Sequence, residues 1–120
     1  MNALFPSSSG IDFSWGTRIF GSDNYLRFLR RFPQDDTLSR LCAALEKGDV
    51  SEAFLCAHNL KGLTRQLGIV GLSGPTSTLC ELLRPQNPDV LPRACSMATD
   101  LRTRYARIVD LICQIGRAHV

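Results

Sequence analysis

The residues of this chain that could do chemistry are concentrated in the run AHNLKGLTR, residues 57–65. Apolar spacing predicts a helix over residues 51–67, and a rotation of about 100° per residue divides its side chains between two faces. The core face is expected to hold Cys56, Leu60, Leu63 and Leu67, with Ala53 and Thr64 near its edge. The opposite, solvent-facing side is expected to hold His58, Lys61, Gly62 and Arg65, extended toward the amino terminus by Ser51, Phe54 and Leu55.

Three residues on the solvent-facing side each suit one part of a group transfer to histidine. An imidazole is a nucleophile near neutral pH, because its ordinary pKa is about 6.5. Lys61 follows His58 by three residues and can sit beside a phosphoryl group placed on that imidazole. Gly62 costs about 1 kcal/mol relative to alanine in a helix interior. That cost is compensated if the missing side chain lets a partner approach His58.

A simpler interpretation of these residues stays open at this point. A helical histidine is usually only solvated or hydrogen-bonded, and a nearby cation usually belongs to a solvated surface. An interior glycine often marks close helix packing, although Gly62 points away from the expected core face. A buried His58 would favour an unrelated helical scaffold with an incidental histidine.

Further helices are predicted on both sides of this segment. Gly21, Pro33 and Gly48 end the three helical stretches that precede it, and Asp35 or Asp36 caps the third. After it, residues 71–75 are expected to form a turn from which Ser73 caps a short helix that Pro85 ends. The last helix is expected to start between Pro88 and about Pro92 and to continue through Ile115.

These signals predict an all-α fold, because no segment shows sustained period-two alternation with β-branched residues. Short turns between the helices imply an antiparallel up-down four-helix bundle with one or two short additional amino-terminal helices. We expect a flexible leader over residues 1–10, the bundle over residues 11–116 and a tail over residues 117–120.

Composition excludes several classes of function. The 120 residues suit one domain, and a net charge of +3 is too small and too scattered to indicate nucleic-acid binding. No apolar run is long enough to span a membrane, and the amino terminus lacks signal-peptide features. Five cysteines without a CxxC pattern favour free thiols in a reducing cytoplasm. No metal site is expected, since the chain has only two histidines and the second, His119, is the penultimate residue, far from His58 in the sequence.

The central run resembles the signature of histidine-containing phosphotransfer (HPt) domains. That signature is a His-x-Leu-Lys-Gly core, then a glycine six residues after the first and a leucine four residues further on. The matching residues here are His58, Leu60, Lys61, Gly62, Gly68 and Leu72. A weaker resemblance covers roughly residues 11–115 and includes the stretches SDNYLRFLRRF and LEKGDVSEAFLCAHNLKG.

The resemblance implies a specific function. HPt domains are four-helix bundles that accept a phosphoryl group from the aspartyl phosphate of a response-regulator receiver domain and pass it to another receiver. They have no kinase activity of their own, and the receiver supplies Mg²⁺. His58 would be the phosphorylated residue, Lys61 would neutralise the phosphoryl charge, and Gly62 would admit the receiver. Receivers, and a hybrid sensor histidine kinase as a further candidate, would be the cytoplasmic partners.

The sequence also departs from the family pattern. Many relatives have Gln or Glu 22 residues after the histidine, where this chain has Cys80. Either the adjacent Glu81 contacts the imidazole after a small shift, or that contact is absent. Arg65 replaces a usually small residue and could add a phosphate contact or crowd the site, and Arg84 is a further candidate neighbour.

Two expectations about binding remain open. Phe54 and Leu55 could form an apolar docking patch, unless the amino-terminal helices partly cover them. The alternative function is a non-catalytic adaptor bundle that binds a receiver or kinase without transferring phosphate.

Overall fold

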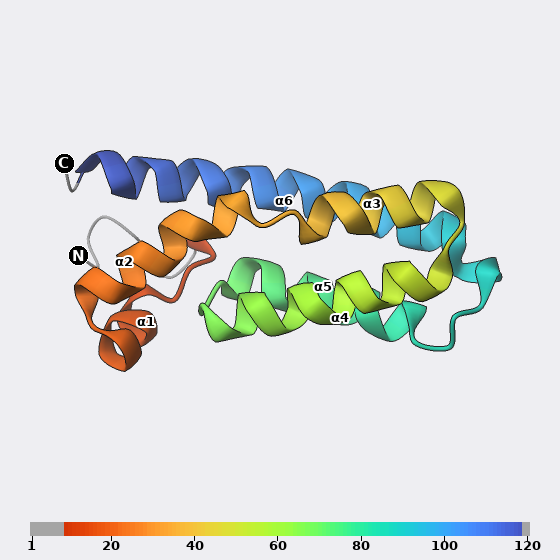
Figure 1. Cartoon of the computed structure of the whole chain (residues 1–120), viewed down its shortest axis with the longest axis horizontal. Coiled ribbons are helices and arrows are strands. Elements are labelled where there is room, and N and C mark those ends of the chain that lie inside the picture. The colour runs from red at the N-terminus through yellow and green to blue at the C-terminus, as the bar shows by residue number, and fades with distance from the viewer. Residues whose placement is uncertain (1–8, 119–120) are drawn as a thin grey trace.

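The computed structural model describes residues 9–118, which are helical and contain no strand (Figure 1). The α-helices are α1 Phe13–Phe20, α2 Ser22–Arg31, α3 Thr37–Lys47, α4 Val50–Gln66, α5 Val70–Leu83 and α6 Leu91–Ala118. Two 3₁₀ turns, η2 over Phe32–Gln34 and η3 over Pro88–Val90, precede α3 and α6. The all-α prediction is therefore confirmed.

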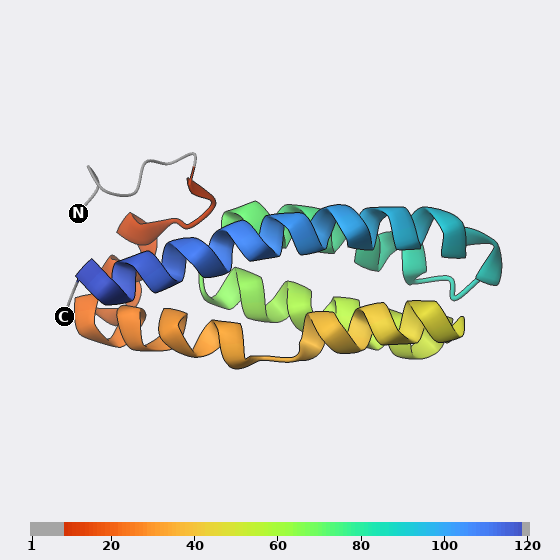
Figure 2. The same ribbon diagram turned by 90° about the horizontal axis from the view of Figure 1, so that it is seen from above.

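Helices α3 to α6 pack around a shared core. Helix α3 contacts α4 and α6, and α5 contacts the same two helices. Helix α6 has 28 residues, or about 42 Å at 1.5 Å per residue, which nearly matches the 46 Å long axis of the molecule. It therefore extends beyond α5 and also packs against α2, so that α2 and α3 follow one another along α6 (Figure 2).

The core is built from aliphatic side chains of every α-helix from α2 to α6. Burial of one such side chain contributes about 1.5–3 kcal/mol. Those with at most 1% exposure are Leu29, Leu41, Leu60, Ile69, Leu72, Leu79, Leu83, Leu101 and Ile115. Among the described helices, none is both long enough and apolar enough to cross a membrane.

Local signals fix both ends of α4. Gly48 ends α3 in the left-handed conformation, with φ +74°, and the Asp49 carboxylate then accepts a hydrogen bond from the Glu52 N–H at 3.0 Å. At the other end Gly68 has φ +67°, and the Ile69 N–H donates to the Thr64 carbonyl at 2.9 Å. The helix therefore matches its predicted bounds to within one residue at each end.

The predicted turn over residues 71–75 is wrong. Gly68 makes the turn, and α5 begins at Val70, so Pro75 lies inside the helix. A proline disfavours helical conformation in the preceding residue through a clash with its Cβ, and Gly74 has no Cβ. Because Gly74 avoids this clash, the helix continues through Pro75. Ser73 is therefore an interior residue of α5 and does not cap it.

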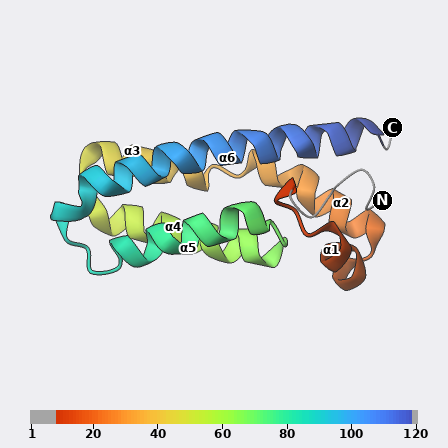
Figure 3. The same cartoon turned by 180° about the vertical axis from the view of Figure 1, so that it is seen from behind.

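Helices α1 and α2 precede α3, and α1 lies beside the turn between α4 and α5 (Figure 3). The Asp12 N–H donates to the Gly68 carbonyl at 2.8 Å, and the Tyr25 hydroxyl donates to the Leu67 carbonyl at 2.6 Å. The Trp15 ring covers Gly68, where a Cβ would lie 2.7 Å from the ring. These contacts join the amino-terminal helices to the end of α4.

Described contacts and helix extend past both expected edges of the bundle. Gly10, assigned to the leader, accepts a hydrogen bond from the Gly71 N–H at 2.8 Å. Helix α6 includes residues 117 and 118, which the sequence assigns to the tail. The rest of the leader, residues 1–8, and His119 with residue 120 lie outside the described residues.

Candidate functional site

His58 lies on the exposed side of α4, in the middle of the helix. Gly62 and Arg65 are exposed on the same side, and Lys61 is half-buried. The opposite side is buried and comprises Ala53, Cys56, Ala57, Leu60 and Thr64. The predicted division into two faces is confirmed for these residues, except that Ala57 is buried in addition and Leu63 is only half-buried.

The His58 imidazole has one ring neighbour. Its centroid lies 6.1 Å from that of the Phe54 ring, with 35° between the planes. Among the described side chains, none forms a hydrogen bond or an ion pair with the imidazole. Its ring nitrogens are therefore accessible from solvent, and the reading of His58 as a buried scaffold residue does not hold.

Lys61 places a positive charge near the Glu81 side chain of α5. Its ammonium makes no ion pair with any described carboxylate. The pKa of the Glu81 carboxyl lies below its usual range, first because Arg84 donates hydrogen bonds to it and further because of the charges of Arg84 and Lys61. Lys61 is thus close enough to α5 to influence Glu81, yet keeps its donors available.

Glu81 does not contact His58. Arg84 holds both carboxylate oxygens, with Nε 3.1 Å from Oε2 and Nη2 2.9 Å from Oε1. Cys80 is completely buried, because it shares the core side of α5 with Leu79 and Leu83. Neither residue therefore forms a described hydrogen bond with the imidazole, such as the resemblance led us to expect from this position.

Arg84 instead contacts the neighbouring helix. Its guanidinium carbon lies 5.2 Å from the centroid of the Phe54 ring. Phe54 is half-buried beneath it, whereas Leu55 remains 54% exposed. The amino-terminal helices do not cover Leu55, since their contacts with α4 are at the Leu67–Gly68 end.

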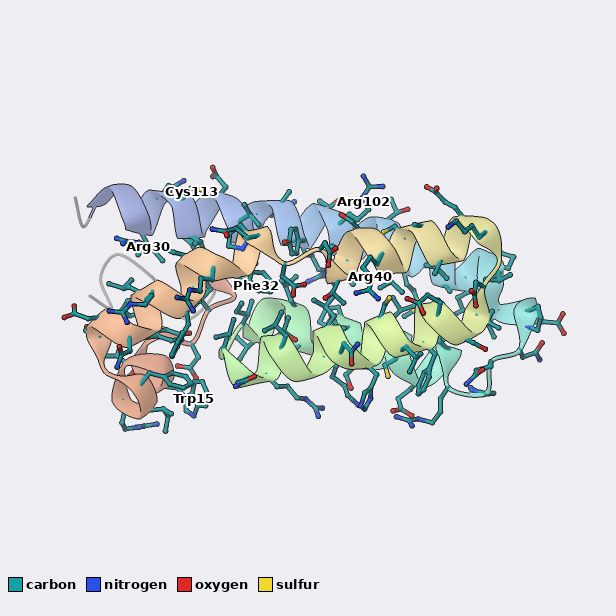
Figure 4. All side chains as sticks on the ribbon, in the orientation of Figure 1. Trp15, Arg30, Phe32, Arg40, Arg102 and Cys113 are labelled. Carbon is teal, nitrogen blue, oxygen red and sulfur yellow. The ribbon has the colours of Figure 1, made fainter. Side chains whose placement is uncertain are left out.

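Gly62 has open space around it. A Cβ built at this position meets no heavy atom within 4 Å, so packing does not require glycine. The side of α4 next to α3 is not open in this way. There, Arg40 of α3 reaches across to α4 and pairs with Glu52 at 3.2 Å (Figure 4). The open space therefore lies on the His58 side of α4, one residue after Lys61.

Arg65 lines a small pocket that no sequence pattern predicts. Helix α1 contributes one wall, and the lining residues are Asp12, Trp15, Thr64, Arg65, Gly68, Val70 and Ser73. Trp15 extends from α1 toward the turn between α4 and α5 (Figure 4). Val70, at the start of α5, is 51% exposed. The contact between Trp15 and Gly68 joins two separate elements of the chain. Apolar spacing within a single helix therefore could not predict it.

Metal ligands are not clustered in the described part of the chain. Residues 9–118 contain no group of three or more His, Cys, Asp or Glu side chains that could hold a metal ion. The five cysteines are free thiols, as predicted.

The described helices thus expose His58 on α4 with Lys61 and Gly62 beside it. The family model described as Hpt domain matches residues 28–111. The chain therefore belongs to the Hpt domain family, which functions in histidine phosphotransfer within two-component phosphorelays and works with receiver domains. No curated protein and no solved structure matches the chain significantly. Helix α1 lies outside the matched residues.

Proposed function

We propose that this chain is a phosphotransfer intermediate in which His58 accepts a phosphoryl group from the aspartyl phosphate of one receiver and passes it to another. The observation that carries this proposal is the exposed imidazole, which has no hydrogen-bond partner within residues 9–118, next to Lys61 and the open space at Gly62. In this proposal α3 to α6 form the antiparallel up-down bundle typical of the family, with His58 midway along α4.

The transfer needs no group on this chain other than the imidazole as nucleophile. The ring nitrogen that carries a lone pair attacks phosphorus in line, while the other ring nitrogen keeps its proton. The O–P bond to the aspartate breaks, and its electron pair leaves with the carboxylate. The product is an N–P bond on His58, and the same steps in reverse deliver the group to the second receiver.

The neighbouring residues would stabilise the phosphoryl group and admit the partner. Lys61 would place its ammonium beside the phosphoryl oxygens, with Arg65 one further turn along the same face. Gly62 would leave room for the loops of the receiver, and Leu55 with the edge of Phe54 would provide apolar contact. Mg²⁺ would come with the receiver and offset the negative charge at the transferring phosphorus.

The proposal excludes an enzymatic activity of the chain itself. A hybrid sensor histidine kinase is a further candidate partner, whereas nucleic acid and membrane are not. The site suits partners in the cytoplasm, where receivers and free thiols coexist.

A transfer assay tests the proposal. The protein is incubated with several phosphorylated receivers and Mg²⁺, and label that is acid-labile and base-stable is measured on it. We expect such label on the wild type and none on His58→Gln. Label retained by His58→Gln, or no label from any receiver, contradicts the proposal, and tight receiver binding without label would indicate the adaptor function.

A further inference from the structure

Three side chains connect the His58 imidazole to α5. We call Phe54, Arg84 and Glu81 the stack. Phe54 lies one helical turn before His58 on α4, and its ring centroid is 6.1 Å from that of the imidazole. Arg84 lies 5.2 Å from the same Phe54 centroid, and Glu81 holds Arg84 through two hydrogen bonds.

Each contact in the stack has a geometry that attracts. Ring pairs attract when their centroids are about 4.5–7 Å apart, and a guanidinium attracts a ring face within about 6 Å. The paired hydrogen bonds from Arg84 Nε and Nη2 fix the plane of the guanidinium. Because Phe54 is also half-buried, its ring is restrained on two sides.

The imidazole has no other described restraint. No described side chain donates a hydrogen bond to it or accepts one from it, and it is exposed on the outer side of α4. A free imidazole samples several rotamers, yet in-line attack needs one nitrogen directed at phosphorus. The only described ring contact that favours one orientation comes from Phe54.

We infer that Phe54 is a positioning residue for His58, and that Arg84 and Glu81 of α5 hold Phe54 in place. This inference rests on the proposed phosphotransfer function of His58. In this inference the Phe54 ring orients the His58 imidazole by direct contact, and the Arg84 guanidinium of α5 holds that ring in place. It also gives the Glu81–Arg84 ion pair a role, although such an exposed pair contributes little to stability by itself.

The test uses phosphoramidate, a small donor that needs no receiver. Its P–N bond breaks, ammonia leaves, and the N–P bond to His58 forms. Phe54→Leu keeps apolar volume but removes the ring, and we expect its labelling rate to fall about two- to fivefold. Phe54→Tyr keeps the ring and should restore the rate. Asn59→Ala, an exposed change beside His58 outside the stack, should label at the wild-type rate.

A spectroscopic readout separates orientation from transfer. The Phe54 ring current shifts the carbon-bound imidazole protons of His58, and Phe54→Leu should abolish that shift in NMR spectra of the unphosphorylated protein. Arg84→Gln should reduce the shift, because Phe54 loses its support, and Arg84→Lys should retain most of it. Thermal unfolding confirms that each variant is folded.

The outcomes are distinct for the inference and for the proposed function. Unchanged labelling and unchanged imidazole shifts in Phe54→Leu would overturn the inference, as would failure of Phe54→Tyr to restore them. If receivers never label the wild type, the phosphorelay role fails, while the imidazole shifts of Arg84→Gln and Arg84→Lys still decide whether Arg84 holds the Phe54 ring against His58.

Discussion

Gly62→Ala should stabilise the protein and at the same time slow its phosphorylation by receivers. Gly62 is an interior residue of α4, and an added Cβ meets no atom within 4 Å. The variant therefore gains the helix propensity of alanine without strain. The gain is about 1 kcal/mol in the free energy of unfolding, which corresponds to roughly 3–5 °C in Tm for a domain of this size.

The effect on transfer has the opposite sign. The new methyl group occupies the open space on the His58 side of α4, where the receiver is proposed to approach. A displacement of about 1 Å between reacting groups can cost about 100-fold in rate, so we expect at least a tenfold slower transfer. Phosphoramidate is small enough to bypass the methyl group and should label Gly62→Ala at nearly the wild-type rate.

The assay compares thermal unfolding with the rate of label transfer from a phosphorylated receiver. Ser96→Ala is a matched control, since Ser96 is exposed on α6, away from α4, and its change should stabilise by about 0.5 kcal/mol without affecting transfer. If Gly62→Ala is less stable than the wild type, the conclusion that a Cβ fits at this position without strain is wrong. Wild-type transfer by that variant would refute the role of Gly62 in access.

Two further predictions concern charge. Lys61→Gln should lower the equilibrium share of phosphoryl groups held by His58 about tenfold relative to the receiver, because the cation beside the phosphoryl group is lost. Lys61→Arg keeps the charge and should retain most of that share. An unchanged distribution between His58 and the receiver at low salt would exclude this role of Lys61. Burial, with a smaller contribution from Asp12, raises the pKa of Tyr25 far above its usual value near 10. Because the folded pKa is raised, the stability is fully present below pH 10 and falls as the pH rises above it, by up to about 1.4 kcal/mol per pH unit. Denaturant unfolding from pH 8 to 11.5 should show this slope in the wild type and a much smaller one in Tyr25→Phe, and equal slopes would contradict it.

Periodicity within one helix was sufficient to predict the face that carries His58. The apolar residues of α4 recur at three and four positions, so Cys56 and Leu60 had to be buried and His58 exposed. Gly48 and the residues around Asp49 likewise marked the helix start, because capping depends on neighbours in the chain.

Contacts between helices could not be predicted in the same way. The rotation of α5 against α4 decides that Cys80 is buried and that Arg84 lies against Phe54, and no spacing within either helix encodes that rotation. The start of α5 was misplaced because Pro75 has the appearance of a first-turn residue, whereas Gly68 already makes the turn and Gly74 accommodates the ring. The position of Trp15 over Gly68 depends on tertiary packing alone.

The pairing of Glu81 with Arg84 would affect the lifetime of the phosphohistidine proposed at His58. A carboxylate near a phosphohistidine could act as a general base and activate water for hydrolysis, but a carboxylate with a lowered pKa is a weaker base. Both oxygens of Glu81 are also occupied, so they are poorly placed to orient a water molecule. Under the proposed function, a phosphoryl group on His58 would therefore persist between encounters and pass to a second receiver in preference to water.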